Sequence, residues 1–308
     1  MTAPLASWNE GPAKQAIMAF VKETTDQASP KFVDPLARIA TFDQDGTTWV
    51  EQPAYAQMMF TFHQLGVMAA KDPKLKGVEP FKTVLSGDRE AIAKLTVPEL
   101  LKIVALTHSG TTTDVFQEIA HDWITTAQHP RFQRLYTDLV YEPMLELMQY
   151  LRANGYKTFI VTGGGQDFVR TYSERVYGVP RDQVVGSAGG TTFGYDASGR
   201  AILTKDPKVL WIDDKTAKPV DIHLMIGRRP VMAFGNSDGD KHMLEYTQGG
   251  DGARFMLLVH HDDAVREYAY GPESVMSPFS DALMAQARQR GWVVASMKND
   301  WKRIFAWE

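Results

Sequence analysis

The chain contains no cysteine among its 308 residues, which excludes disulfides, thiolate metal sites and cysteine nucleophiles. Its apolar runs are short, well below the ~18 to 20 residues that a membrane-spanning helix needs. The formal net charge is -4, the sequence pI is about 6.1, and no long run of lysine or arginine occurs. Neither nucleic acid nor a membrane is therefore expected as a partner.

The remaining composition is that of a globular protein. Hydrophobic residues make up 44% of the chain, and its length suits one large or two modest domains. The N-terminal residues lack the charged and apolar regions of a secretory signal, so a cytoplasmic location is expected for the chain as written. A periplasmic location would apply if an export signal had been removed, because a cysteine-free chain suits both compartments. The oligomeric state stays open.

Two acidic residues follow a short apolar run near the N-terminus. Residues 39–42 read IATF, and Asp43 and Asp45 come directly after them, followed by Gly46 and two threonines. In an extended chain, residues i and i+2 point to the same side, so these two carboxylates would crowd and repel each other. We therefore expect a cation at this position.

The order of the predicted elements indicates an α/β protein. From residue 53 to about 139 the pattern is helical, whereas strands and helices alternate after residue 141, which predicts a parallel sheet with helices on both faces. The predicted strands cover residues 39–42, 158–161, 184–186, 231–234, 254–259 and 292–295, with a hairpin turn at 196–199. The predicted helices cover residues 11–25, 55–70, 97–106, 111–127, 143–153, 166–177, 218–226, 240–246 and 279–290.

Three of these strands run into polar, glycine-containing loops. The loops cover residues 43–47, 162–165 and 235–240. Because ligands bind at the carboxyl ends of strands in open parallel sheets, we expect the three loops to form one site. An oxygen-only set of ligands with several carboxylates suits magnesium together with a substrate phosphate.

The predicted site has a place for each role in phosphoryl transfer. Asp43 is positioned to attack phosphorus, and Asp45 to protonate the leaving oxygen and then deprotonate water. Thr162 and the backbone N–H groups of Gly163 and Gly164 are expected to bind phosphate oxygens. Lys218 is the first candidate for the cation that balances the phosphoryl charge, and Lys215 is the second.

These motifs resemble those of the haloacid dehalogenase superfamily. FDQDGT resembles the first motif, DxDGT; VTGG resembles the second; and GNSDGDKHML resembles the fourth, written GDxxxDxxML in the phosphoserine phosphatase-like branch. Lys218 or Lys215 would be the lone lysine of the third motif. The resemblance implies a Rossmann-like core at residues 1–52 and 140–308, and an inserted all-helical C1 cap domain at residues 53–139.

The resemblance also implies a function. It is that of a magnesium-dependent phosphatase that hydrolyses a small phosphate monoester through a phospho-aspartate at Asp43. The family binds the metal through the nucleophile, the backbone carbonyl of the second aspartate, here Asp45, and an acid of the fourth motif. At that last place this chain has Asn236, which brings no charge, so Asp240 or Asp238 would have to compensate. Gly46 and Thr47 are expected to contribute to phosphate binding.

Other functions are compatible with the same motifs. A phosphomutase would share all of them, whereas a dehalogenase would need neither magnesium nor an acid at Asp45. A catalytically weak protein that binds a phosphate ligand is the alternative favoured by Asn236. A dinucleotide site is excluded by spacing, because Phe168 stands where the last glycine of G-x-G-x-x-G should be. His260 and His261 are adjacent on a predicted strand and would face opposite sides, so they are not expected to share an ion.

Overall fold

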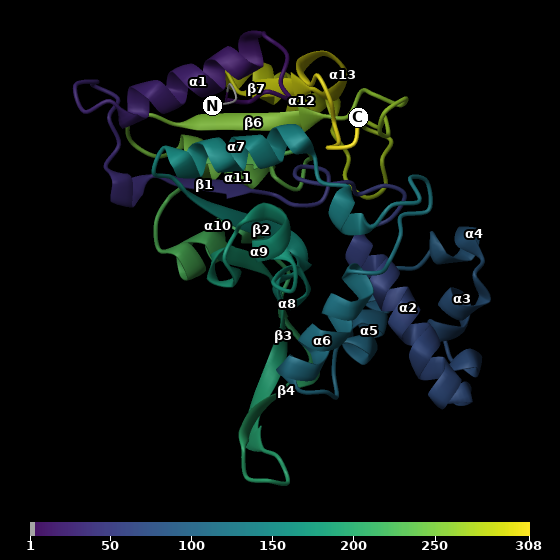
Figure 1. Cartoon of the computed structure of the whole chain (residues 1–308). Helices are drawn as coiled ribbons and strands as arrows, with labels where there is room; N and C mark the ends of the chain where they lie inside the picture. The colour runs from purple at the N-terminus through teal and green to yellow at the C-terminus, as the bar shows by residue number, and fades with distance from the viewer. Residues whose placement is uncertain (1–3) are drawn as a thin grey trace.

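A seven-stranded sheet forms the core of the protein. The computed structural model describes residues 4–308, and its strands follow the order β4-β3-β2-β1-β5-β6-β7 (Figure 1). Every neighbouring pair is parallel except β3 and β4, which form an antiparallel hairpin. The strands are β1 Ile39–Phe42, β2 Lys157–Gly165, β3 Val184–Tyr195, β4 Ala201–Trp211, β5 Met232–Gly235, β6 Phe255–His260 and β7 Val293–Ser296. The predicted α/β, Rossmann-like fold class is confirmed.

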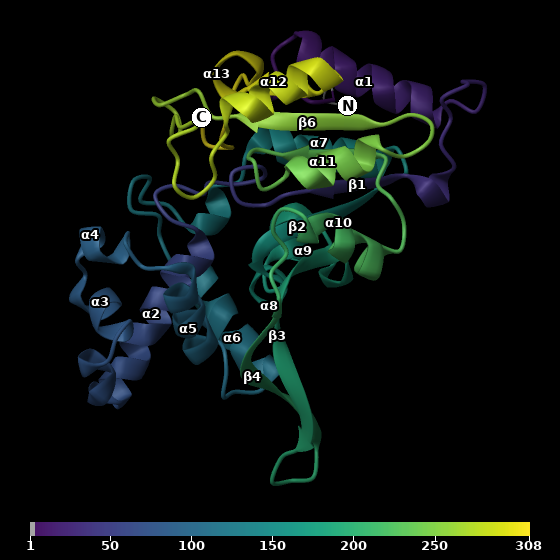
Figure 2. The same ribbon diagram turned by 180° about the vertical axis from the view of Figure 1, so that it is seen from behind.

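Helices cover both faces of the sheet, as Figures 1 and 2 show from opposite sides. Alternate strand residues belong to different apolar clusters: Phe234 packs in the cluster that includes α1 and α7, and Ala233 in the cluster that includes α11 and α12. The strands are therefore buried on both sides, as parallel strands require. The helices of the core are α1 Pro12–Thr25, α7 Glu142–Ala153, α8 Gln166–Val169, α9 Ser173–Tyr177, α10 Ala217–Asp221, α11 Lys241–Gln248, α12 Asp281–Arg290 and α13 Met297–Asp300.

A helical insert separates β1, which ends at Phe42, from α7, which begins at Glu142. Its helices are α2 Ala56–Lys71, α3 Phe81–Ser86, α4 Arg89–Ile92, α5 Val97–Thr107 and α6 Thr113–Ile124. The insert has a small apolar core of its own, in which Leu65, Phe81 and Ile103 are buried. It also pairs with the hairpin, because Gly110 N donates to Lys205 O at 2.9 Å and Lys205 N donates to Thr111 O at 2.8 Å. These bonds attach the insert to β4 of the core.

Two predictions about the helices are wrong. Residues 166–177 form two short helices, α8 and α9, because the N–H groups of Thr171 and Tyr172 bond three residues back, to Phe168 O at 3.1 Å and Val169 O at 3.2 Å, which ends the α-helical pattern of α8. From the sequence, Asp238 is expected to cap a helix that begins near Gly239, but α11 begins at Lys241 after Asp240, and Asp238 instead accepts a hydrogen bond from Ser280 Oγ at 2.7 Å. The short helices α3, α4 and α13 were not predicted, since each is too short to show a helical period.

No helix within residues 4–308 is long and apolar enough to cross a membrane.

Candidate active site

The three polar loops lie together at the carboxyl edge of the sheet. β1 is the central strand, with β2 on one side and β5 on the other, so their C-terminal ends are adjacent. The backbone confirms the closeness, because Asp43 N donates to Phe234 O at 2.9 Å. The convergence expected from the sequence is therefore present.

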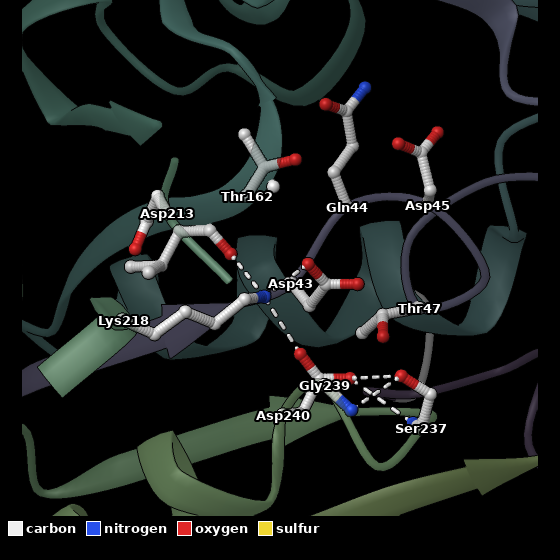
Figure 3. Close-up of polar contacts among 12 residues, drawn as sticks. Asp43, Gln44, Asp45, Thr47, Thr162, Asp213, Lys218, Ser237, Gly239 and Asp240 are labelled. Atoms are coloured by element: carbon white, nitrogen blue, oxygen red, sulfur yellow. Dashed lines mark hydrogen bonds and ion pairs between the residues drawn. The ribbon is translucent and has the colours of Figure 1, made fainter. Parts of the chain in front are cut away.

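Lys218 lies between two carboxylates at this edge (Figure 3). Its Nζ atom is 2.5 Å from Asp43 Oδ1 and 2.7 Å from Asp240 Oδ1, and it also donates to Val161 O at 3.0 Å. Burial opposes the charge of this lysine, but the surrounding carboxylates, led by Asp240 and Asp43, raise its pKa well above the usual value. Lys215, the second candidate, is exposed and makes none of these contacts.

Burial gives the two acids of the first loop unusual pKa values. The pKa of Asp43 lies well above its ordinary value because of burial and the nearby Asp240, although Lys218 opposes this shift. Burial also raises the pKa of Asp45 to about 6, while a 2.7 Å hydrogen bond from Trp49 Nε1 to its Oδ1 acts in the opposite direction. An acid with a pKa near 6 can both donate and accept a proton close to neutral pH.

The donor chemistry of the site fits a magnesium ion. One lysine faces three carboxylates, Asp43, Asp45 and Asp240, so a second cation would balance the charge of these acids when they ionise. Within residues 4–308, no three His, Asp or Glu side chains form a preformed metal cluster. Magnesium does not need one, because it takes one or two carboxylates and completes its shell with carbonyl oxygens, water and phosphate.

Two of the three fourth-motif candidates, Asn236 and Asp240, differ in how their oxygens are used. Asp240 Oδ1 binds Lys218, and its Oδ2 accepts from the backbone N–H groups of Asn236 at 2.9 Å and Ser237 at 3.1 Å. Asn236 Oδ1 accepts one hydrogen bond, from Thr47 Oγ1 at 2.9 Å, and a carbonyl oxygen has a second lone pair. Asn236 is thus the candidate with spare ligand capacity, and Asp240 mainly fixes Lys218 and the loop.

The predicted phosphate-binding residues fall into two groups. Thr162, Gly163 and Gly164 line a cavity that opens above the three loops, and Gly164 N donates to Thr162 Oγ1 at 3.0 Å. Gly46 and Thr47 lie outside that lining, and their N–H groups donate to Trp49 O and Gln44 O. This placement does not support direct phosphate contacts by Gly46 and Thr47.

Gly46 has a structural role instead. Its φ is +74°, and a Cβ atom there would lie 2.1 Å from Asn236 Nδ2 and 2.7 Å from Glu51 Oε1. His261 Nε2 donates to Gly46 O at 2.7 Å, so this histidine supports the first loop. The prediction that His260 and His261 do not share an ion stays a prediction.

A buried acid that the sequence did not reveal lies behind the site. Glu51 is 1% exposed and accepts hydrogen bonds from Asn236 Nδ2 at 3.2 Å, from Ser277 Oγ at 2.6 Å and from the Tyr270 hydroxyl. Burial raises its pKa to about 8. No motif singles out Glu51, because its partners lie far along the chain.

A second unpredicted acid, Asp213, lies beside Lys218 (Figure 3). It is fully buried, and its carboxylate faces that of Asp221, with which it can share a proton when one of the two acids is protonated. Burial, partly opposed by Lys218, raises its pKa to about 8. Its backbone N–H donates to Ser187 Oγ at 2.9 Å, and Ser187 Oγ donates to Gly163 O at 2.8 Å, which links Asp213 to the second loop.

A cavity of about 630 Å³ opens above the loops, between the sheet edge and the helical insert. Asp43, Asp45 and Lys218 lie in its lining together with residues of α2, α5 and α6. The volume is within the range of small-molecule sites and leaves room for much more than a phosphate group. Two lining residues join the two parts: Gln57 Oε1 accepts from Gly165 N at 2.7 Å, and the Tyr55 hydroxyl donates to Met276 O at 3.1 Å.

Comparison with known proteins shows the fold. No family model and no curated protein matches the sequence. A protein of unknown function from Anaerococcus prevotii is similar over 92% of this chain and 91% of its own, with 14% identity and a TM-score of 0.55. Another from Bordetella pertussis Tohama I is similar over 83% and 97%, with 15% identity and a TM-score of 0.50. A phosphoserine phosphohydrolase-like protein from Francisella tularensis covers 73% of this chain and 88% of its own, with 16% identity and a TM-score of 0.38. At these identities the likeness concerns the fold alone.

Proposed function

We propose that the protein is a magnesium-dependent phosphatase that hydrolyses a small phosphate monoester through a phospho-aspartate on Asp43. The observation that carries this proposal is the contact of Lys218 Nζ with both Asp43 and Asp240 at the edge where the three loops meet. The positive charge of a lysine held there offsets the repulsion between the phosphoryl group and the attacking carboxylate. The motif resemblance agrees with this chemistry.

In the first step, a carboxylate oxygen of Asp43 attacks phosphorus and the bond from phosphorus to the ester oxygen breaks. Asp45, in its protonated form, donates its proton to the leaving oxygen, so the product is the free alcohol. The pKa of about 6 leaves a usable fraction of protonated Asp45 at neutral pH. Trp49 Nε1 binds Oδ1 of Asp45 and so orients this carboxyl group.

In the second step, Asp45 accepts a proton from water, and the resulting hydroxide attacks phosphorus. The bond between phosphorus and Asp43 breaks, which releases phosphate and restores the carboxylate. Lys218 stays bound to Asp43 and Asp240 and holds the attacking group in place. The helical insert would act as a cap that excludes bulk water while the phospho-enzyme exists.

Asp43, the backbone carbonyl of Asp45 and the side-chain oxygen of Asn236 would hold the magnesium ion. When bound, the ion supplies positive charge to the phosphoryl oxygens and to the buried carboxylates.

The test compares wild type with Asp43→Asn on 4-nitrophenyl phosphate, with magnesium and with EDTA. We expect the substitution to lower kcat by about 1,000-fold or more, since it removes the nucleophile, and EDTA to abolish wild-type activity. Asp251→Asn, a change of the same type at an exposed loop residue, should behave as wild type. Wild-type turnover in Asp43→Asn would contradict the mechanism, and full activity in EDTA would contradict the metal.

A further inference from the structure

Helix α5 is apolar on two faces. Leu100, Ile103 and Leu106 pack in the small core of the insert. Val97, Leu101, Val104 and Ala105 recur at spacings of four, three and one residues on another face, and all of them line the active-site cavity. This second face lies outside the small apolar core of the insert.

The apolar wall continues onto the neighbouring helices. Met58 of α2 and Phe116 of α6 also line the cavity, as does Phe168 of α8. Val97 is 64% exposed, so part of this wall faces water. Covering apolar surface that faces water is favourable, and a ligand in this cavity would do so.

The polar groups within this wall are bonded to each other. Gln57 Oε1 is occupied by Gly165 N, so the amide nitrogen of Gln57 faces His108 Nε2, 3.2 Å away, and donates to it. The proton of His108 then lies on Nδ1, which donates to Thr107 Oγ1 at 2.9 Å. Burial, with a contribution from Lys205, lowers the pKa of His108 to about 3, so the ring is neutral.

The part of the cavity wall formed by α5 carries no charged side chain, whereas the lysines and aspartates of the lining lie on the sheet, its loops, α8 and α10. Neither arginine nor glutamate occurs among the lining residues in the described part of the chain. Lys205 is paired with Asp167 and lies 4.5 Å from the ring centroid of Phe116, while Lys208 and Lys215 are exposed. A carboxylate or ammonium group placed against α5 would lose its water without gaining a partner.

We propose that the alcohol released by this enzyme is bulky and apolar, an aryl or medium-length alkyl group that packs against Val97, Leu101 and Val104 of α5. This inference rests on the proposed phosphatase function, and it concerns the part of the substrate beyond the phosphate. Esters of amino acids such as O-phosphoserine are poor substrates, because both charges of the amino acid would face the apolar wall.

Two measurements test the proposal. The first is kcat/KM of the magnesium-loaded enzyme for methyl, butyl and hexyl phosphate, phenyl phosphate and O-phospho-L-serine. Each buried CH2 should raise kcat/KM by up to about 4-fold. Phenyl and hexyl phosphate should exceed O-phospho-L-serine by about 100-fold. The second is calorimetric binding of the same alkyl phosphates to Asp43→Asn, which reports on the cavity without turnover.

Leu101→Asn supplies the variant, and Leu36→Asn, the same change at a residue 69% exposed outside the cavity, is its control. Leu101→Asn should weaken the rise of kcat/KM with chain length, so that kcat/KM for hexyl phosphate falls by about 10-fold. Leu36→Asn should match wild type. If Leu101→Asn fails to fold, Val97→Asn replaces it, because Val97 is mostly exposed.

The outcomes separate the two proposals. Turnover with a preference for O-phospho-L-serine, or with no dependence on chain length, overturns the apolar leaving group and leaves the phosphatase function in place. Absence of turnover, with binding that tightens from methyl to hexyl phosphate, overturns the phosphatase function and supports the apolar site. Equal binding of all alkyl phosphates overturns the apolar site.

Discussion

Asn236 Nδ2 lies 3.2 Å from Glu51 Oε1, and both side chains are 1% exposed. The resemblance would place an aspartate at position 236, but an aspartate could not donate this hydrogen bond and would add a second buried acid beside Glu51. Asn236 therefore supplies a hydrogen-bond donor to the buried Glu51, which an aspartate could not do.

Asn236→Asp should therefore destabilise the metal-free protein. We expect the free energy of unfolding to fall by about 1 to 3 kcal/mol, because a buried hydrogen bond is lost and two acids become neighbours. Urea unfolding in EDTA measures the change. Combining it with Glu51→Gln should restore most of the stability, whereas the exposed control Asn299→Asp should stay within about 0.5 kcal/mol of wild type. No rescue by Glu51→Gln would contradict the pairing.

Lys218→Met should be among the most destabilising single changes in the core. It leaves Asp43 and Asp240 buried without their cation, and breaking a buried ion pair from one side costs about 3 to 5 kcal/mol. Urea unfolding at neutral pH in EDTA measures the loss. Lys215→Met removes an exposed lysine three residues away and should change the unfolding free energy by less than about 0.5 kcal/mol. Similar losses in the two variants would mean that the contacts of Lys218 do not stabilise the fold.

Asp213 should make the protein less stable as the pH rises. Its pKa is about 8 in the folded protein and near the ordinary 3.8 in the unfolded chain, so the folded state holds a proton that the unfolded chain has released. The stabilisation that comes from this proton is complete below about pH 4 and is lost progressively as the pH rises to about 8. Asp213→Asn cannot titrate, and at pH 8 it should exceed wild type by on the order of 1 to 3 kcal/mol.

The control for this prediction is Asp214→Asn, a change of the same type at the exposed neighbouring residue. Thermal and urea unfolding of the metal-free proteins between pH 5 and pH 8.5 would compare the slopes. Parallel curves for wild type and Asp213→Asn would show that Asp213 is ionised in the folded protein.

Gln57→Ala should loosen the contact between the helical insert and the second loop. The Gly165 N–H loses its acceptor, and the loss of one such bond, worth about 1.4 kcal/mol, speeds hydrogen exchange there by about 10-fold. Exchange measured by mass spectrometry on peptides that contain residue 165 tests this. Gln64→Ala, on the same helix but outside the cavity lining, should leave exchange there unchanged. Equal exchange in Gln57→Ala and wild type would show that the bond does not hold the loop.

The elements that the sequence predicted are those with a clear local pattern. The apolar run before Asp43 and the alternation after residue 141 are properties of neighbouring residues, so the sheet, most helices and the meeting of the three loops could be inferred. The break between α8 and α9 could not, because it depends on a local change of backbone bonding, in which Thr171 and Tyr172 bond three residues back, and no single residue type signals it. The short helices α3 and α4 have too few turns to show a period.

By itself, the sequence determined the fold class and the order of the acidic, glycine-rich loops, because a strand or helix period and a turn residue act over a few positions of the chain. Only the tertiary structure decided that Lys218 and not Lys215 contacts Asp43, and that Glu51 bonds Asn236 from 185 residues away. Such contacts depend on how distant elements pack, and burial then sets the charge of the acids. The apolar face of α5 likewise gained its meaning only when packing turned it toward the cavity.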